Sequence, residues 1–299
     1  MGYSGRYHAA SLVAVFVALA IGILIGVGLG SDVVSGTAED LEQSLESDLD
    51  EARAEVDELQ AELGEEGEFG RLAQPALVRD RLVAAEVGLI ALGGLGDDLT
   101  DDVREALQGT GATLTEVAVI REPPDAEALV DAAGTEVPGR SRGDAVEAAA
   151  HRAGRLLVEG GVRFEDLRAA LFSRYSGDPR GIDAVVVARG RPSELEGRDD
   201  ENTDRLEDGL VAGLRAGLLG GPAGASMVGV ERSDTEESSV TFFGQRDVST
   251  VDNVDEVAGR VALVYVLCGA EGNFGTKDSA DGLLPDLLAT AGCTASTSG

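Results

Sequence analysis

The chain has 299 residues, of which 55 are acidic and 24 basic, so its formal net charge is −31 at pH 7. Hydrophobic residues make up 43% of the sequence, enough for a sizeable core, and this excludes wholesale disorder. Because so acidic a chain repels phosphate backbones, we expect no nucleic acid among its partners.

The amino-terminal region is predicted to decide where the protein resides. Residues 9–30 contain no charged side chain, and a helix of that length covers a hydrocarbon core of about 30 Å. We therefore predict a transmembrane helix over 9–30 in a single-pass protein of the cell membrane or envelope. Basic residues before this segment and acidic ones after it place residues 1–8 in the cytoplasm and the rest outside. A cleaved signal peptide is the alternative, and the choice between inner and outer membrane stays open.

An acidic stalk is predicted to follow over residues 31–67. Apolar residues recur there at steps of three and four, as in a coiled coil. Five of them are predicted to bind a partner: Leu41, Leu45, Leu49, Val56 and Leu59. The acidic residues between them would repel a parallel copy, so the stalk pairs with a basic partner helix, forms a homo-oligomer in high salt, or stands alone. Gly64 and Gly67 are predicted to end the helix in a hinge.

The body, residues 72–292, is predicted to be an α/β domain, because short β-branched runs alternate with helical stretches. Strands are expected at Val87–Leu92, Thr113–Ile120, Ala184–Ala188 and Met227–Val230. Helices are expected at about Asp98–Leu107, after the prolines at 123–124, at Asp144–Glu159, at Phe164–Phe172, and up to Leu219 from a cap at Asn202. The run Val261–Leu267 fits a strand or a buried helix. This alternation favours a mainly parallel sheet covered on both faces, followed by a disordered tail at 293–299.

Two short motifs invite a functional interpretation and favour a structural one. The run GGLG at 93–96 lies where a phosphate loop would, but Leu99 stands in place of the third glycine and acidic residues follow, so a tight turn and helix cap are predicted. Asp252 and Asp255 are spaced for two calcium ligands, but the remaining pattern of a calcium loop is missing. A capped turn is predicted there.

Candidate metal ligands are scarce. Four weak candidates for a copper site are Cys268, Cys293, Met227 and His151, and none lies in a metal-binding spacing. Cys268 fits a small core residue, His151 a surface or satisfied histidine, and the two cysteines fit either a disulfide or free thiols. No arrangement of serine, histidine and acid stands out, so we expect no catalytic residues and no enzyme. A copper ion is the one cofactor considered.

Several blocks of the sequence together resemble a known family. These are YHAASLVAVFVALAIGILIGVGLGS, the acidic coil behind it, STVDNVDEVAGRVALVYVL and GNFGTKDSADGLLP. They are similar to the mycobacterial copper transport protein B (MctB) family of actinobacteria. The resemblance implies a cell-envelope protein of copper efflux or tolerance, described for the family as a channel-forming outer-membrane component. It also implies a link to cell separation through septal wall hydrolases.

Two functions are therefore expected to compete. The first is copper efflux or homeostasis, which follows from the resemblance. The second is a membrane-anchored coiled-coil scaffold that recruits a cell-envelope or division protein through its stalk and regulates cell separation without copper chemistry of its own.

Overall fold

The computed structural model describes residues 5–134, 141–160, 164–177, 181–191, 195–219 and 226–288. Within these ranges it describes the backbone alone at 5–10, 26–43 and 164–166. The chain divides into two compact units, residues 1–66 and residues 67–299. The tail predicted to be disordered, residues 293–299, lies outside the described residues.

One helix, α1, runs from Gly5 to Val78. Among the described residues, no helix has an apolar stretch long enough to cross a membrane. That finding overturns the transmembrane helix predicted over 9–30. The placement of residues 1–8 in the cytoplasm rested on the same prediction and falls with it.

The hinge predicted at Gly64 and Gly67 is also wrong. Helix α1 continues through both glycines and through Pro75. A Cβ atom added at either glycine would have nothing within 4 Å, so nothing in the surroundings demands a break there. A glycine inside a helix costs only about 1 kcal/mol relative to alanine. A helix this long tolerates that cost.

The body contains a seven-stranded mixed sheet. In chain order its strands are β1 (Glu86–Gly93), β2 (Thr113–Ile120), β3 (Phe172–Gly177), β4 (Ala184–Gly190), β5 (Ser226–Val230), β6 (Ser249–Val251) and β7 (Asn273–Phe274). Their order across the sheet is β3-β2-β1-β4-β5-β6-β7. All neighbours are parallel except β2 and β3, which are antiparallel. The carboxyl ends of the six parallel strands therefore share one edge, called the carboxyl edge below.

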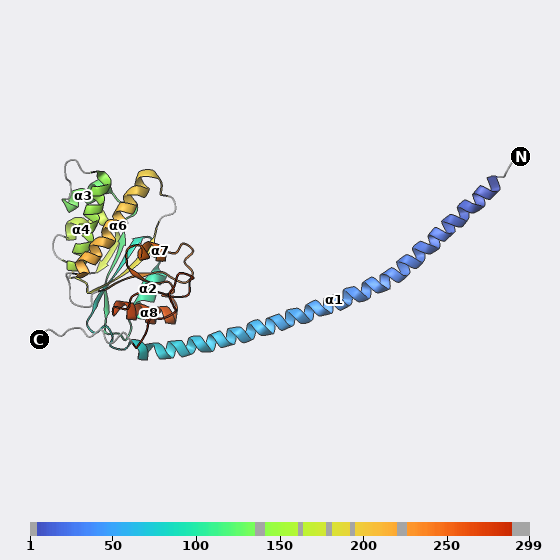
Figure 1. Ribbon diagram of the computed structural model, residues 1–299, viewed down its shortest axis with the longest axis horizontal. Helices are drawn as coiled ribbons and strands as arrows, with labels where there is room; N and C mark the ends of the chain where they lie inside the picture. Colours follow the sequence, from blue (N-terminus) through green and yellow to red (C-terminus); the bar gives the residue numbers. More distant parts are fainter. Residues whose placement is uncertain are drawn as a thin grey trace. The chain divides into compact units, whose positions relative to one another are not determined.

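Helices cover both faces of this sheet (Figure 1). One face carries α3 (Ala126–Ala133), α4 (Arg142–Glu159), α5 (Phe164–Leu171), α6 (Gly197–Leu219) and α7 (Val240–Gly244). The other carries α2 (Asp97–Ala106) and α8 (Val257–Leu267). The predicted α/β class with both sheet faces covered is confirmed, with the antiparallel edge strand β3 making the sheet mixed.

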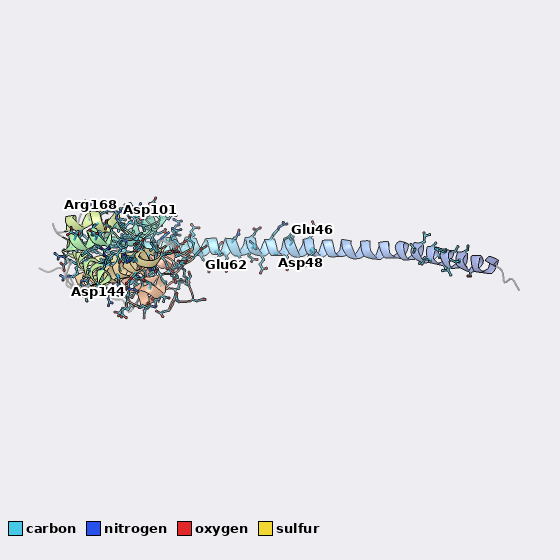
Figure 2. All side chains as sticks on the ribbon, turned by 90° about the horizontal axis from the view of Figure 1, so that it is seen from above. Glu46, Asp48, Glu62, Asp101, Asp144 and Arg168 are labelled. Carbon is cyan, nitrogen blue, oxygen red and sulfur yellow. The ribbon has the colours of Figure 1, made fainter. Side chains whose placement is uncertain are left out.

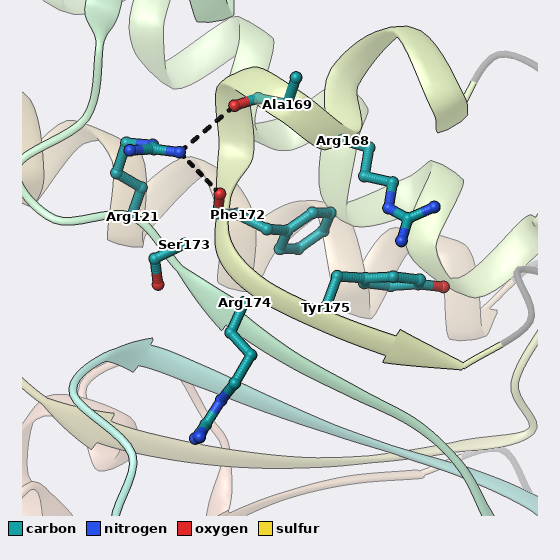
Figure 3. Close-up of a pocket in the computed structure, with 7 residues that line it drawn as sticks. All are labelled: Arg121, Arg168, Ala169, Phe172, Ser173, Arg174 and Tyr175. Carbon is teal, nitrogen blue, oxygen red and sulfur yellow. Dashed lines mark hydrogen bonds between the residues drawn. The ribbon is translucent and has the colours of Figure 1, made fainter.

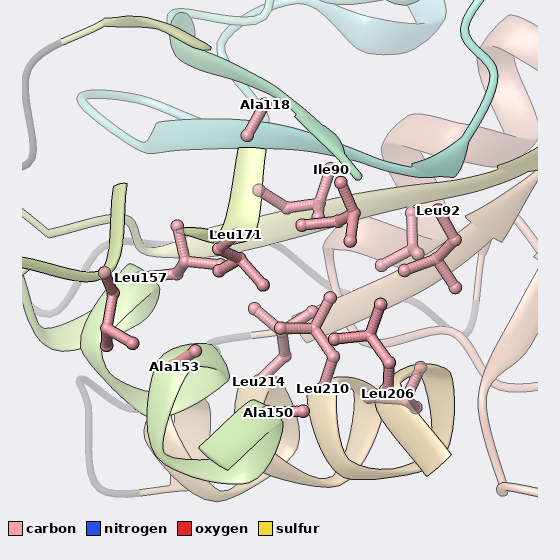
Figure 4. Close-up of a cluster of buried hydrophobic side chains, with 14 of the residues drawn as sticks. Ile90, Leu92, Ala118, Ala150, Ala153, Leu157, Leu171, Leu206, Leu210 and Leu214 are labelled. Carbon is pink, nitrogen blue, oxygen red and sulfur yellow. The ribbon is translucent and has the colours of Figure 1, made fainter. Parts of the chain in front are cut away.

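Alternate residues of the strands supply the two cores. Ile90 and Leu92 of β1 point toward α4 and α6, where they meet Leu206, Leu210 and Leu214 (Figure 4). Val87 and Leu89 of the same strand belong to the core under α2 and α8. This alternation is the two-residue period of a strand, and it explains why the central strands are apolar throughout.

Helices α4 and α6 approach closely because α6 presents a glycine every four residues, at Gly209, Gly213 and Gly217. A Cβ atom added at Gly213 would lie 2.1 Å from the backbone oxygen of His151 on α4. At Gly209 the corresponding distance to the backbone oxygen of Glu147 is 2.3 Å. Since real Cβ atoms do not approach so near, these glycines are a steric requirement of the helix pair.

Most predicted elements of the body are confirmed, and the ambiguous run Val261–Leu267 is helical, within α8. One boundary is wrong: Asn202 lies inside α6, which begins at Gly197. Four elements were not predicted, namely β3, α7, β6 and β7. Only Phe172 of β3 is buried, so this edge strand lacks the apolar run on which the prediction depends.

Candidate functional site

The structure does not bring the weak metal candidates together. His151 lies half-buried on α4, Met227 lies half-buried on β5 and packs against the core, and Cys268 follows α8. Cys268 is disulfide-bonded, so it presents no thiolate, the form in which cysteine binds metals. Cys293 lies outside the described residues. Within the described part of the chain, no group of three or more His, Cys, Asp or Glu side chains is placed to hold a metal ion.

The five predicted partner-binding residues of the stalk lie on one continuous helix, and the four whose side chains are described are open to solvent. Leu45, Leu49, Val56 and Leu59 are exposed by 59%, 50%, 50% and 51%. The side chain of Leu41 lies outside those described. An apolar stripe that stays half exposed on a helix is a surface on which another helix can pack.

Acidic side chains surround this stripe. Glu46, Asp48 and Glu62 project from α1 into solvent (Figure 2). The basic side chain of Arg53 pairs with Asp50 at 3.3 Å, and both groups are about two-thirds exposed. Such an exposed ion pair adds little to stability. The single positive charge of Arg53 also leaves most of the acidic side chains beside the stripe without a counter-charge, so the border of the stripe is strongly negative.

At the carboxyl edge, a buried carboxyl group lies just beyond β2. Both oxygens of Glu122 are shielded from solvent, and neither has a hydrogen-bond partner among the described residues. Burial raises the pKa of Glu122 to about 8; the charge of Glu207 adds to the rise, while Arg189 and Arg191 oppose it. The group is therefore mostly protonated at neutral pH, unlike an ordinary glutamate.

Its neighbour Glu207 on α6, by contrast, has hydrogen-bond partners for its buried carboxylate. The carboxylate is 1% exposed and accepts two hydrogen bonds from Arg189, at 2.7 and 3.0 Å. Arg191 adds a longer contact of 3.5 Å and also pairs with Asp200 and Asp204. This two-pronged pair fixes α6 to the end of β4, because a guanidinium and a carboxylate match in shape as well as in charge.

Glycines bring the ends of β1 and β4 together beside Glu122. The amide of Gly94 donates to the carbonyl oxygen of Gly190 at 2.6 Å. Gly93 has a φ of +79°, and a Cβ atom there would lie 2.7 Å from Glu122 Oε2. Gly96 is the N-cap residue of α2. The predicted helix cap is therefore confirmed at Gly96.

A second polar cluster occupies the carboxyl edge beyond β5, β6 and β7. Glu231 accepts hydrogen bonds from Ser238 Oγ, from the amide and hydroxyl of Ser239, and from Lys277 Nζ at 2.6 Å. Asp252 accepts from the amides of Thr276 and Lys277, at 2.8 and 3.2 Å. These carboxylates thus bind protein donors and hold three strand ends together.

Asp255 has a similar structural role. It accepts hydrogen bonds from the amide and the hydroxyl of Ser233, both at 2.7 Å. Although burial alone would raise its pKa, these bonds outweigh the effect, and the pKa of Asp255 is lowered. The turn predicted in this region is present at residues 254–255, but the predicted cap is not found: the N-cap residue of α8 is Glu256, which makes no side-chain cap bond.

The family model described as "Copper transport outer membrane protein, MctB" matches residues 3–285, nearly the whole chain. The chain belongs to the MctB family. No curated protein matches the chain. Membership supports a role related to copper transport at the cell envelope, and it confirms the resemblance inferred from the sequence.

Two of the four blocks that carried the MctB resemblance meet in space. STVDNVD contributes β6 and Asp252, and GNFGTKDSADG contributes β7 and Lys277. A Cβ atom at Gly275 would lie 1.8 Å from Asp252 Oδ1, so the glycine of the second block leaves room for the acid of the first. These two MctB-like motifs thus pack together where β6 and β7 end.

Neither Glu122 nor Glu207 was predicted from the sequence. Both lie in contact with residues that are remote in the chain, so no local spacing marks them. A weak signal existed: Glu122 follows two residues after a strand end, where functional groups of α/β proteins gather.

Proposed function

We propose that this MctB-family chain acts in copper efflux or tolerance at the cell envelope, as a non-enzymatic component. The observation that carries the proposal is the family match over residues 3–285. Copper is the cargo in this proposal.

We further propose that helix α1 is the surface through which the chain joins its partner. A single helix gains most of its stability from packing its apolar face, and the stripe containing Leu49, Val56 and Leu59 has no cover among the described residues. From Ser44 to Glu66 the helix carries ten acidic residues against Arg53 alone. A partner helix with basic flanks therefore fits better than a second copy, since like charges facing each other across a coiled coil repel.

The test is complementation of a strain that lacks the gene. It receives the natural protein, a stripe variant (Leu49→Ser, Val56→Ser and Leu59→Ser together) or a control variant (Ala54→Ser and Ala61→Ser), whose sites lie off the stripe. Intracellular copper is measured by mass spectrometry, with protein levels checked in parallel. We expect copper to rise in the deletion strain and to return to normal with the natural and control proteins but not with the stripe variant.

The two parts of the proposal fail separately. Unchanged copper in the deletion strain would refute the copper role. Full restoration by the stripe variant would leave the copper role intact and refute the role of α1.

A further inference from the structure

A cleft with cationic walls lies where α5 leads into the edge strand β3. Its volume is about 490 Å³, and seven of the residues that the structure describes line it: Arg121, Arg168, Ala169, Phe172, Ser173, Arg174 and Tyr175 (Figure 3). Three of these seven are arginines and none is acidic. In a chain with a net charge of −31, that is a local reversal of sign.

Protein contacts hold the three guanidinium groups in place. Arg121 donates to the backbone oxygens of Phe172 and Ala169, at 2.9 and 3.5 Å. Arg168 lies over the ring of Tyr175, 4.8 Å from its centre. An arginine that is already positioned loses less side-chain entropy when it binds a ligand.

Arg174 forms the third wall and has the weakest ties. It donates to Asp97 Oδ1 at 3.3 Å and to the backbone oxygen of Leu95 at 3.4 Å. Arg174 is 52% exposed and Asp97 is 91% exposed, so solvent screens this ion pair. A stronger anion can therefore replace Asp97 as the partner of Arg174.

The cleft also lies where ligands of α/β proteins bind. Arg121 directly follows β2, Leu95 lies in the loop after β1, and Asp97 is the first residue of α2. Because β3 is antiparallel to β2, the start of β3 lies beside the carboxyl end of β2. Ligands of open α/β sheets bind outside the carboxyl ends of the strands.

We propose that this cleft binds a phosphate-bearing ligand with more than one negative charge. Each guanidinium group carries several N–H donors that match phosphate oxygens, and the three arginines line the same cleft. The phosphate belongs either to a small soluble molecule or to a lipid headgroup. This inference is independent of the copper role.

The test uses the full chain and two probes. Inorganic pyrophosphate is titrated by calorimetry, and vesicles of phosphatidylglycerol are compared with vesicles of phosphatidylcholine by co-sedimentation. We expect binding of pyrophosphate or of the anionic vesicles. Pyrophosphate binding identifies a soluble ligand, and binding of the anionic vesicles alone identifies a headgroup.

Two double variants that each remove two positive charges distinguish binding in the cleft from attraction to the overall charge of the protein. Arg121→Gln with Arg174→Gln should weaken binding at least tenfold, whereas Arg142→Gln with Arg155→Gln, which removes the same charge from α4, should change it less than twofold. Asp97→Asn should strengthen binding by freeing Arg174. If the double variant misfolds, Arg174→Gln alone carries the test, because its partners are an exposed acid and a loop carbonyl.

Absence of binding to both probes would overturn the proposal. Equal weakening in the cleft and control variants would do the same, since it would show that only net charge matters.

Discussion

Helices α6 and α1 carry the same kind of apolar pattern with opposite outcomes. Leu206, Leu210 and Leu214 of α6 are fully buried against the sheet and α4. Leu49 and Leu59 of α1 are half exposed. The spacing of apolar residues thus shows that a helix has an apolar face. It does not show whether that face packs against the same chain, as in α6, or stays exposed, as in α1.

The first test of this comparison is to truncate a leucine to alanine on each helix. Leu210→Ala should lower the free energy of unfolding of the body by about 3 kcal/mol, because it leaves a cavity in a packed core. Leu59→Ala should change it by less than about 0.5 kcal/mol, as expected for a site away from the core. Urea unfolding followed by tyrosine fluorescence measures both, since Tyr265 is buried in the body. Equal losses would contradict the comparison.

The second test is to add a methyl group to each helix. Gly213→Ala should destabilise the body by about 2 kcal/mol, because the new Cβ would collide with the backbone of α4. Gly67→Ala has open space around it and should instead raise helix content slightly, by reducing the entropy of the unfolded chain. Thermal unfolding followed by circular dichroism distinguishes them. If Gly213→Ala left the unfolding temperature unchanged, α4 and α6 would have to be free to move apart.

The third test extends the comparison from apolar to acidic side chains. Because the pKa of Glu122 in the folded protein is raised to about 8, the unfolded chain releases a proton that the folded chain retains between about pH 4.5 and pH 8. Stability therefore falls as pH rises through that window. Glu122→Gln should remove this fall and stabilise the protein by about 1 kcal/mol at pH 8, with little effect at pH 5.

The matched control is Glu127→Gln, which changes an exposed glutamate on α3. Urea midpoints at both pH values should be the same as those of the natural protein for this control. A Glu122→Gln curve parallel to that of the natural protein would show that Glu122 ionises normally.

Local patterns predicted the central strands well, because β1, β2, β4 and β5 are apolar runs bounded by turn residues. They did not predict β3, an exposed edge strand whose position depends on β2. They also placed a hinge at Gly64 and Gly67 in α1, where turn propensity was outweighed by the helix on either side.

The candidate sites were harder to predict than the fold. The buried environment of Glu122 arises from Gly93, Arg189 and Glu207, which are distant in sequence and meet only after folding. The arginines of the cationic cleft likewise come from two segments, at 121 and at 168–174. The scarcity of metal ligands could be seen in the sequence, but the sequence did not show whether Cys268 forms a disulfide or is a free thiol.

The most direct measurement is the reactivity of cysteines placed on α1 in living cells. Leu59→Cys lies on the apolar stripe and Ala61→Cys faces away from it, so their maleimide labelling rates compare the two faces whatever the identity of the partner. If another helix covers the stripe, Leu59→Cys should label at least tenfold more slowly than Ala61→Cys in cells, and at a similar rate in the purified chain. Equal labelling of both sites in cells would contradict the account.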